Sequence, residues 1–128
     1  MENRNGSPTR LIGVNRSGTE YSCLKGSFSD DPIDTTSLLA IRAWNINPIR
    51  IPLNQDCWLN RNGIKFGGNL YQDALTKYIT TINDLGMIAI LDLHWNAPKG
   101  ELADGQQPLP DQQSITFWSD VAAQYKSN

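Results

Sequence analysis

The most constraining feature of the sequence is an almost unbroken apolar run at residues 87–93, which follows directly on a helical pattern. A run of this length predicts a β-strand, and its continuous apolar character is typical of a strand buried on both faces of a parallel sheet. Before it, Asn69 is placed to cap a helix that stops at Gly86. The apolar positions of this helix recur at helical spacing: Tyr71, Leu75, Tyr78, Ile82 and Leu85.

The same alternation of strand and helix occurs earlier in the chain. Residues 10–15 predict a short buried strand, and residues 49–53 predict a second strand, in which Pro52 should lie near the C-terminal end. Between the two strands, Asp34 can cap a helix. The positions of this helix expected in the core are Leu38, Ile41 and Trp44.

A long segment without periodicity, residues 96–111, follows the third strand. Loops of this length are usually functional or mobile. Asp111 can then cap a last helix, with Phe117, Val121 and Tyr125 on one side. Three consecutive strand–helix units predict an α/β fold with parallel strands. Because three units leave apolar strand edges unpaired, the first three units of a (β/α)8 barrel fit the chain better than a small complete α/β domain, which remains possible.

Composition excludes several classes of function. The chain carries 11 basic and 13 acidic side chains, so we expect neither a nucleic-acid nor a membrane partner. One histidine and two cysteines leave almost no material for a metal site, and the missing Gly-rich phosphate loop argues against a nucleotide cofactor. Residues 1–9 are polar, lack the apolar segment of a signal peptide, and are expected to form a flexible lead-in.

Polar side chains and tryptophans gather where the predicted strands end, which is where parallel α/β proteins carry their chemistry. The residues concerned are Asn15, Glu20, Trp58, His94, Trp95 and Asn96, and the second strand itself carries Arg50. Hydrogen-bonding groups beside flat aromatic faces suit a sugar ring. Each has a structural alternative: Arg50 can be a charge paired with Asp92, His94 can be an ordinary core or surface histidine, and either tryptophan can belong to the core.

Four segments, in this order, resemble the first part of glycoside hydrolase family 5, the cellulase family of (β/α)8-barrel glycosidases. They are Ile12-Gly13-Val14-Asn15, Ile49-Arg50-Ile51-Pro52-Leu53, Leu91-Asp92-Leu93-His94-Trp95 and Phe117-Trp118-Ser119-Asp120-Val121-Ala122. The resemblance covers roughly residues 10–126 and implies that residues 10–128 are the N-terminal part of a catalytic domain. It implies a retaining hydrolase of the endo-β-1,4-glucanase type that acts on β-linked polysaccharide, needs no cofactor and is a monomer at full length.

The resemblance also implies roles for individual residues. Arg50 matches the arginine that orients the nucleophilic glutamate and keeps it ionised, and His94 matches the histidine that hydrogen-bonds sugar hydroxyls beside the scissile bond. Both support catalysis without carrying it. The residues expected to contact the substrate are Trp95, which shapes the same wall, Trp58, as a stacking platform, and Asn15, Glu20 and Asn96.

The two catalytic glutamates of that family have no counterpart in the sequence. Glu2, Glu20 and Glu101 are the only glutamates, and none follows an asparagine at the end of a strand. We therefore expect an N-terminal portion of the enzyme that is inactive alone. A non-catalytic carbohydrate-binding α/β domain is the alternative.

A barrel would bring the two cysteines close to each other. Cys23 follows the first strand and Cys57 the second, so both loops should rise on the same face of a barrel. We expect a disulfide, with the two Cα atoms less than about 7 Å apart. A disulfide fits an oxidising compartment, and the resemblance is to a bacterial, secreted subgroup.

Overall fold

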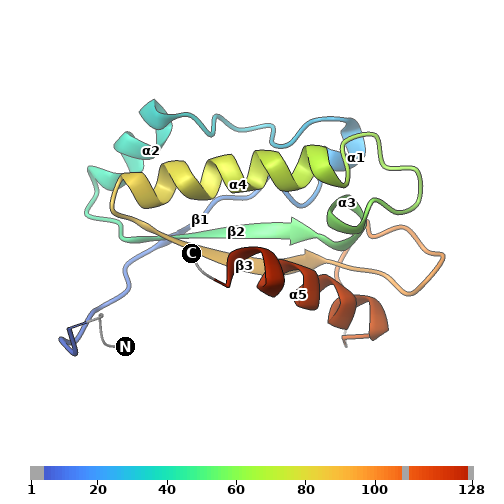
Figure 1. The fold of residues 1–128 in the computed structure, drawn as a ribbon. Helices are drawn as coiled ribbons and strands as arrows, with labels where there is room; N and C mark the ends of the chain where they lie inside the picture. Colours follow the sequence, from blue (N-terminus) through green and yellow to red (C-terminus); the bar gives the residue numbers. More distant parts are fainter. Residues whose placement is uncertain (1–4, 108–109, 127–128) are drawn as a thin grey trace.

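The computed structural model describes residues 5–107 and 110–126 and contains a parallel sheet of three strands (Figure 1). The strands are β1 (Val14–Asn15), β2 (Pro48–Asn54) and β3 (Ile88–Trp95), in the order β1-β2-β3. The helices are α1 (Ser22–Lys25), α2 (Thr35–Arg42), α3 (Gln55–Leu59), α4 (Asn69–Asp84) and α5 (Gln112–Tyr125). The predicted alternation of parallel strands and helices, as in the first three units of a (β/α)8 barrel, is confirmed.

Part of two expectations falls beyond the described residues. Residues 1–4 of the expected lead-in lie outside them, as do residues 108–109 of the long loop. Within the described ranges, no helix combines the length and the apolar character needed to cross a membrane.

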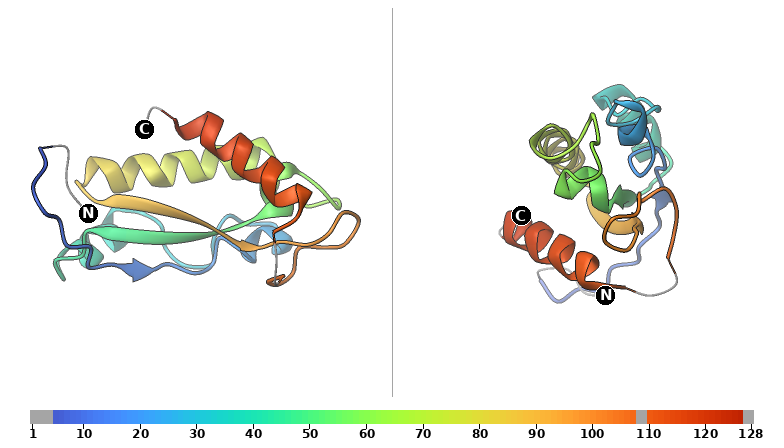
Figure 2. Two further views of the ribbon diagram at one scale, coloured as in Figure 1. Left: turned by 90° about the horizontal axis from the view of Figure 1, so that it is seen from below. Right: turned by 90° about the vertical axis from the view of Figure 1, so that its right-hand side faces the viewer.

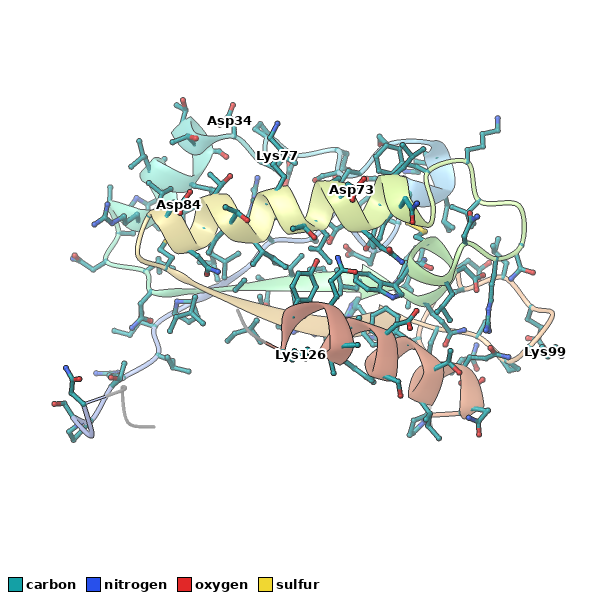
Figure 3. All side chains as sticks on the ribbon, in the orientation of Figure 1. Asp34, Asp73, Lys77, Asp84, Lys99 and Lys126 are labelled. Carbon is teal, nitrogen blue, oxygen red and sulfur yellow. A yellow bond between two sulfur atoms is a disulfide. The ribbon has the colours of Figure 1, made fainter. Side chains whose placement is uncertain are left out.

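The longest helix, α4, packs as its sequence pattern predicts. Its buried face consists of Tyr71, Leu75, Tyr78, Ile79 and Ile82, while Asp73 and Lys77 lie on its exposed side (Figure 3). The start differs from the prediction: Gly68, with φ 58°, is the N-cap, and Asn69 is the first helical residue. Gly86 follows the helix with φ 73°, the left-handed conformation that glycine adopts at helix ends.

The helices cover one face of the sheet and leave the other open (Figure 2). Ile49, Ile51 and Leu53 of β2 are completely buried toward the helices. The predicted burial of β3 on both faces is wrong, because Ile88 is 44% exposed and Ile90 38% exposed. Side chains alternate between the faces of a strand, so these two lie on the face that no described helix covers. In a closed barrel this face is the interior.

The first strand is shorter and more exposed than predicted. Only Val14–Asn15 pairs with β2, and Ile12 is 47% exposed, in place of a buried strand over residues 10–15. The side chain of Asn47 accepts a hydrogen bond from the Ile12 amide and donates one to the Arg10 carbonyl, both at 2.8 Å, where a strand would continue its ladder. Gly13 lies so close to Pro48 that a Cβ atom would come within 2.5 Å of its ring.

Trp44 is the clearest misplacement of a core residue. The sequence pattern places it on the buried face of a helix, but it is 78% exposed. The helix α2, which Asp34 caps as predicted, ends at Arg42, and Asn45 then turns the chain with φ 60°. Trp44 thus lies beyond the helix, where helical spacing no longer decides which way a side chain points.

Candidate functional site

Three charged or ionisable side chains from β2 and β3 meet on the open face: Arg50 lies in the first half of β2, and Asp92 and His94 lie in the second half of β3. Arg50 Nη2 lies 2.5 Å from Asp92 Oδ2, and His94 Nδ1 lies 3.0 Å from the same oxygen. Arg50 Nη2 is also 3.3 Å from His94 Nδ1. We call Arg50, Asp92 and His94 the open cluster, because 28–35% of each side chain remains exposed.

Strand register brings the open cluster together. Arg50 pairs with Ile90 and Pro52 pairs with Asp92, so Arg50 and Asp92 point to the same face from neighbouring strands. Asn15 of β1 pairs with Arg50 on its other side and accepts a long hydrogen bond of 3.4 Å from Arg50 Nη1. The sequence-based alternative that Arg50 pairs with Asp92 is confirmed, and that pairing leaves the guanidinium accessible to a ligand.

Trp95 follows His94 in β3, and Gln106 contacts the His94 ring. The ring of Trp95 lies 6.0 Å from that of Tyr21. Tyr21 donates a hydrogen bond of 2.7 Å to Asp30, and this bond raises the pKa of the Tyr21 hydroxyl to about 12. Gln106, from the long loop, places its amide nitrogen 3.2 Å from both ring nitrogens of His94. Gln106 could not be assigned to the site from the sequence, because a loop without periodicity carries no signal of what it contacts.

Asn96 anchors the long loop at the rim of the site. Its backbone amide donates to the Gly105 carbonyl at 3.0 Å, and its side-chain oxygen accepts from the Gln107 amide at 3.1 Å. A pocket of about 290 Å³ opens beside it, and this pocket is lined by Asp92, Leu93, Asn96, Gln107, Pro110, Ser114 and Trp118. Asn96 therefore fixes the loop and also reaches accessible space next to Asp92.

Two residues expected to contact the substrate are instead part of the protein interior. Trp58 is 1% exposed and packs against Phe117 and Tyr125, so the prediction of a stacking platform is wrong. Its position in the short helix α3 turns the ring toward α5. Glu20 is 5% exposed, and its carboxylate accepts a hydrogen bond of 2.7 Å from the Gly18 amide two residues away. This is a structural contact in place of the expected substrate contact.

A second group of polar side chains lies at the end of β2 and the start of α3 and is almost fully buried. We call Asn54, Gln55 and Asp56 the buried cluster; each is at most 1% exposed. The Asn54 oxygen accepts from the Asp56 and Cys57 amides and so caps α3. The Asn54 amide donates to the carbonyls of Glu20 and Ala103, each at 2.8 Å.

The buried cluster holds the long loop against α3. Asp56 accepts hydrogen bonds from the Ala103 amide at 2.9 Å and from the Asn62 side chain at 2.7 Å. Gln55 donates to the Ala97 carbonyl at 2.9 Å. Most of these groups pair with backbone of the segments after β1 and β3, which has no sheet partner, so these bonds are structural, whereas Gln55 Oε1 is buried without a hydrogen-bond partner among the described residues.

The predicted disulfide is confirmed. Cys23 and Cys57 are bonded, and their Cα atoms lie 6.1 Å apart. The bond joins α1 to α3 and thereby ties the segments that follow β1 and β2 to each other. Tyr21 directly precedes α1, so the bond also fixes the segment that carries Tyr21.

The open cluster can bind hydroxyl or carboxylate groups, since it combines a guanidinium with five donors and an imidazole. It holds a single carboxylate, Asp92, which is already shared between two cationic or donor groups. Among the described residues, no group of three His, Cys, Asp or Glu side chains is placed to hold a metal ion. Paired carboxylates for acid–base cleavage of a glycosidic bond would have to come from elsewhere.

Comparison with known proteins identifies one family. The family model described as Cellulase (glycosyl hydrolase family 5) matches residues 3–128, which is nearly the whole chain. No curated protein matches the sequence.

Proposed function

Because the chain belongs to glycosyl hydrolase family 5, the cellulase family, we propose that it is part of a retaining enzyme of the endo-β-1,4-glucanase type that cleaves β-linked polysaccharide. The observation that carries the proposal is the open cluster, whose His94 directly precedes Trp95 in β3. Donors and an imidazole on the open face of parallel strands, followed in the chain by a tryptophan, suit the hydroxyls and the C–H face of a sugar. Family membership itself implies glycoside hydrolysis.

In this proposal each exposed group has a separate role. Arg50 donates to Asp92 and, with its remaining N–H groups, to the carboxylate of the nucleophile, which it keeps ionised. His94 hydrogen-bonds a sugar hydroxyl, and Trp95 forms the wall of the same subsite. Asn15 supports Arg50 from β1. None of these residues cleaves the bond.

We further propose that the acid–base and nucleophilic glutamates lie in other strand–helix units of a complete barrel. The open face supports this, because Ile88 and Ile90 are apolar side chains left partly exposed on the face that a closed barrel buries. We assign neither described glutamate as acid, base or nucleophile, because the Glu20 carboxylate is buried and bonded to the Gly18 amide, and Glu101 is an exposed residue of the long loop. The 128-residue chain should therefore not hydrolyse carboxymethylcellulose.

The disulfide supports a proposed place of action. Disulfides persist in oxidising compartments, so we propose that the enzyme is secreted. We propose a monomer for the complete barrel, because closure of the sheet removes the strand edges through which copies would pair.

A binding experiment tests the proposal on the chain itself. His94 is the only histidine, so its ring signals report on the site without interference from other imidazoles. Titration with a β-1,4-linked glucose tetrasaccharide should shift these signals in a saturable way at millimolar concentrations. The W95A variant should bind about tenfold more weakly, a difference of about 1.4 kcal/mol.

W44A is the matched control, because Trp44 is an exposed tryptophan outside the site. It should bind as the wild-type chain does. No response of His94 to any β-glucan oligosaccharide would overturn the proposal. Hydrolysis of carboxymethylcellulose by the purified chain would instead contradict the placement of the glutamates. If a complete natural protein bound the tetrasaccharide but had no strand that ends in an Asn-Glu pair, the result would favour the alternative of a non-catalytic carbohydrate-binding domain.

A further inference from the structure

One nitrogen of His94 faces two neighbours that demand opposite protonation states. Asp92 Oδ2 lies 3.0 Å from His94 Nδ1, and Arg50 Nη2 lies 3.3 Å from the same nitrogen. An ionised carboxylate only accepts hydrogen bonds, so it requires a proton on Nδ1. A guanidinium only donates, so it requires a lone pair on Nδ1. The tautomer of a neutral His94 therefore depends on which neighbour prevails.

The geometry favours the carboxylate. Arg50 Nη2 is already bonded to Asp92 Oδ2 at 2.5 Å, much closer than its 3.3 Å approach to the imidazole. The Asp92 oxygen thus receives two donors at once, Arg50 and His94, and both bonds are strengthened by charge. With the proton on Nδ1, the other ring nitrogen, Nε2, carries a lone pair.

Gln106 is consistent with this assignment. Its amide nitrogen, which only donates, lies 3.2 Å from each ring nitrogen of His94. It can form a hydrogen bond only to a nitrogen with a lone pair, and a proton on Nδ1 leaves Nε2 as that partner. Because the two distances are equal, Gln106 could also donate to Nδ1 in the opposite tautomer, so Asp92 and not Gln106 selects between the two.

We propose that Asp92 is a positioning residue that holds His94 in the Nδ1–H tautomer and so makes Nε2 an acceptor for a sugar hydroxyl. The part that concerns the sugar rests on the proposed function, and the part that concerns the tautomer does not. His94 Nε2 has one lone pair, so a sugar hydroxyl that donates to it takes the place of the Gln106 N–H, and the displaced Gln106 amide can donate to the oxygen of the same hydroxyl. The site thereby selects groups that both donate and accept, which hydroxyls do and ether oxygens do not.

The wild-type chain provides the first test. In a ¹⁵N-labelled sample, long-range proton–nitrogen correlations of the single imidazole distinguish a protonated nitrogen from one with a lone pair. At alkaline pH, where an ordinary imidazole is neutral, we expect the proton on Nδ1. A dominant Nε2–H tautomer in this sample would overturn the proposal.

Three variants identify the residue that sets the tautomer. D92A should shift the proton to Nε2, because Arg50 Nη2 then donates to Nδ1 from its place 3.3 Å away. R50M and Q106A are matched controls that remove the other two neighbours of the ring, and both should keep the Nδ1–H tautomer. A switch in either control, or none in D92A, would show that Asp92 does not set it.

D92A leaves the half-buried Arg50 without its carboxylate partner, and this variant could fail to fold for that reason. The double variant D92A/R50M removes both charges and is tested in that case. The double variant should lose the preference for Nδ1–H that R50M retains, and an unchanged preference would overturn the proposal.

Oligosaccharide titration separates the hypothesis about the tautomer from the hypothesis about sugar binding. D92A should bind the tetrasaccharide about tenfold more weakly, and equal binding after a tautomer switch would overturn the role of Nε2 as the acceptor. A wild-type chain with Nδ1–H that gives no oligosaccharide response would contradict the proposed function.

Discussion

The open cluster lies within β2 and β3 and the buried cluster lies at the end of β2 and the start of α3, yet their polar groups have different partners. Asn54, Gln55 and Asp56 are at most 1% exposed and are bonded mainly to backbone groups of the loops around them. Arg50, Asp92 and His94 keep about a third of their side chains exposed and are bonded to one another. Polarity at a strand end therefore does not identify a binding site. Burial and the identity of the partner separate structural groups from groups left free for a ligand.

Removal of the disulfide should have the largest effect on stability and should sharpen this contrast. The bond closes a loop with a sequence separation of 34 residues, and its loss in C23S/C57S should lower the free energy of unfolding by roughly 4 kcal/mol. Urea denaturation measures this change. Because the bond anchors α3 beside the buried cluster, the His94 ring signals of the still-folded fraction should stay as in the oxidised chain.

Reduction of the wild-type chain is the matched control, because it breaks the same bond without replacing an atom of the cysteines. It should reproduce the destabilisation of C23S/C57S. A loss of less than about 1 kcal/mol in both samples would show that the buried cluster and the apolar core hold this end of the molecule without the bond.

The N54A variant tests whether the buried cluster is structural. Four groups lose a partner: two amides of α3 and the carbonyls of Glu20 and Ala103. Because buried groups cannot turn to water, we expect a loss of about 3 kcal/mol in the free energy of unfolding, measured by urea denaturation.

N15A is the matched control for N54A. Asn15 also ends a strand, but it is exposed and makes only the 3.4 Å contact to Arg50. Its loss should cost less than about 0.5 kcal/mol. Equal costs for the two variants would remove the distinction between the clusters.

Local signals predicted the fold well, and long-range contacts account for the errors. Asp34 and Asp111 cap their helices as predicted, because a cap is formed within three residues of itself. Asp56 could not be assigned from the sequence, since its partner Ala103 is 47 positions away on a loop without periodicity. Trp58 was misplaced for the same reason: its position after a strand is local, whereas the helix that buries it, α5, comes much later in the chain.

Two tyrosines, Tyr71 near the buried cluster and Tyr21 on the side of the open cluster, test the contrast between the clusters through the pH dependence of stability. Tyr71 is fully buried behind the buried cluster, donates to the Thr19 carbonyl at 2.9 Å, and burial raises the pKa of its hydroxyl. A pKa raised in the folded state contributes stability below the ordinary value of about 10, and this contribution is lost as pH rises above it. The free energy of unfolding should therefore fall above about pH 10, and Y71F should weaken that fall.

At neutral pH, Y71F should cost about 1.5 kcal/mol, because the Thr19 carbonyl loses its donor. Y21F is the control beside the open cluster: Tyr21 is bonded to the exposed Asp30, so its removal should leave stability at neutral pH nearly unchanged. Urea denaturation at several pH values measures both. If the stability of Y71F depended on pH as the wild type does, Tyr71 would not be a source of the alkaline loss.

The smallest effect on stability is expected for H94A. This variant tests most directly whether the open cluster differs from the buried cluster. The bond of His94 to Asp92 is about one-third exposed, and solvent screens such pairs, so removal of the imidazole should change the free energy of unfolding by less than about 0.5 kcal/mol. Arg50 keeps its bond to Asp92 in this variant, so no buried charge is left unpaired. Calorimetric titration should nevertheless show a loss of tetrasaccharide binding of about tenfold or more, because the acceptor for the hydroxyl is gone. A destabilisation close to that of N54A, with binding retained, would place the open cluster among the structural elements and leave the chain without an assigned sugar contact on β3.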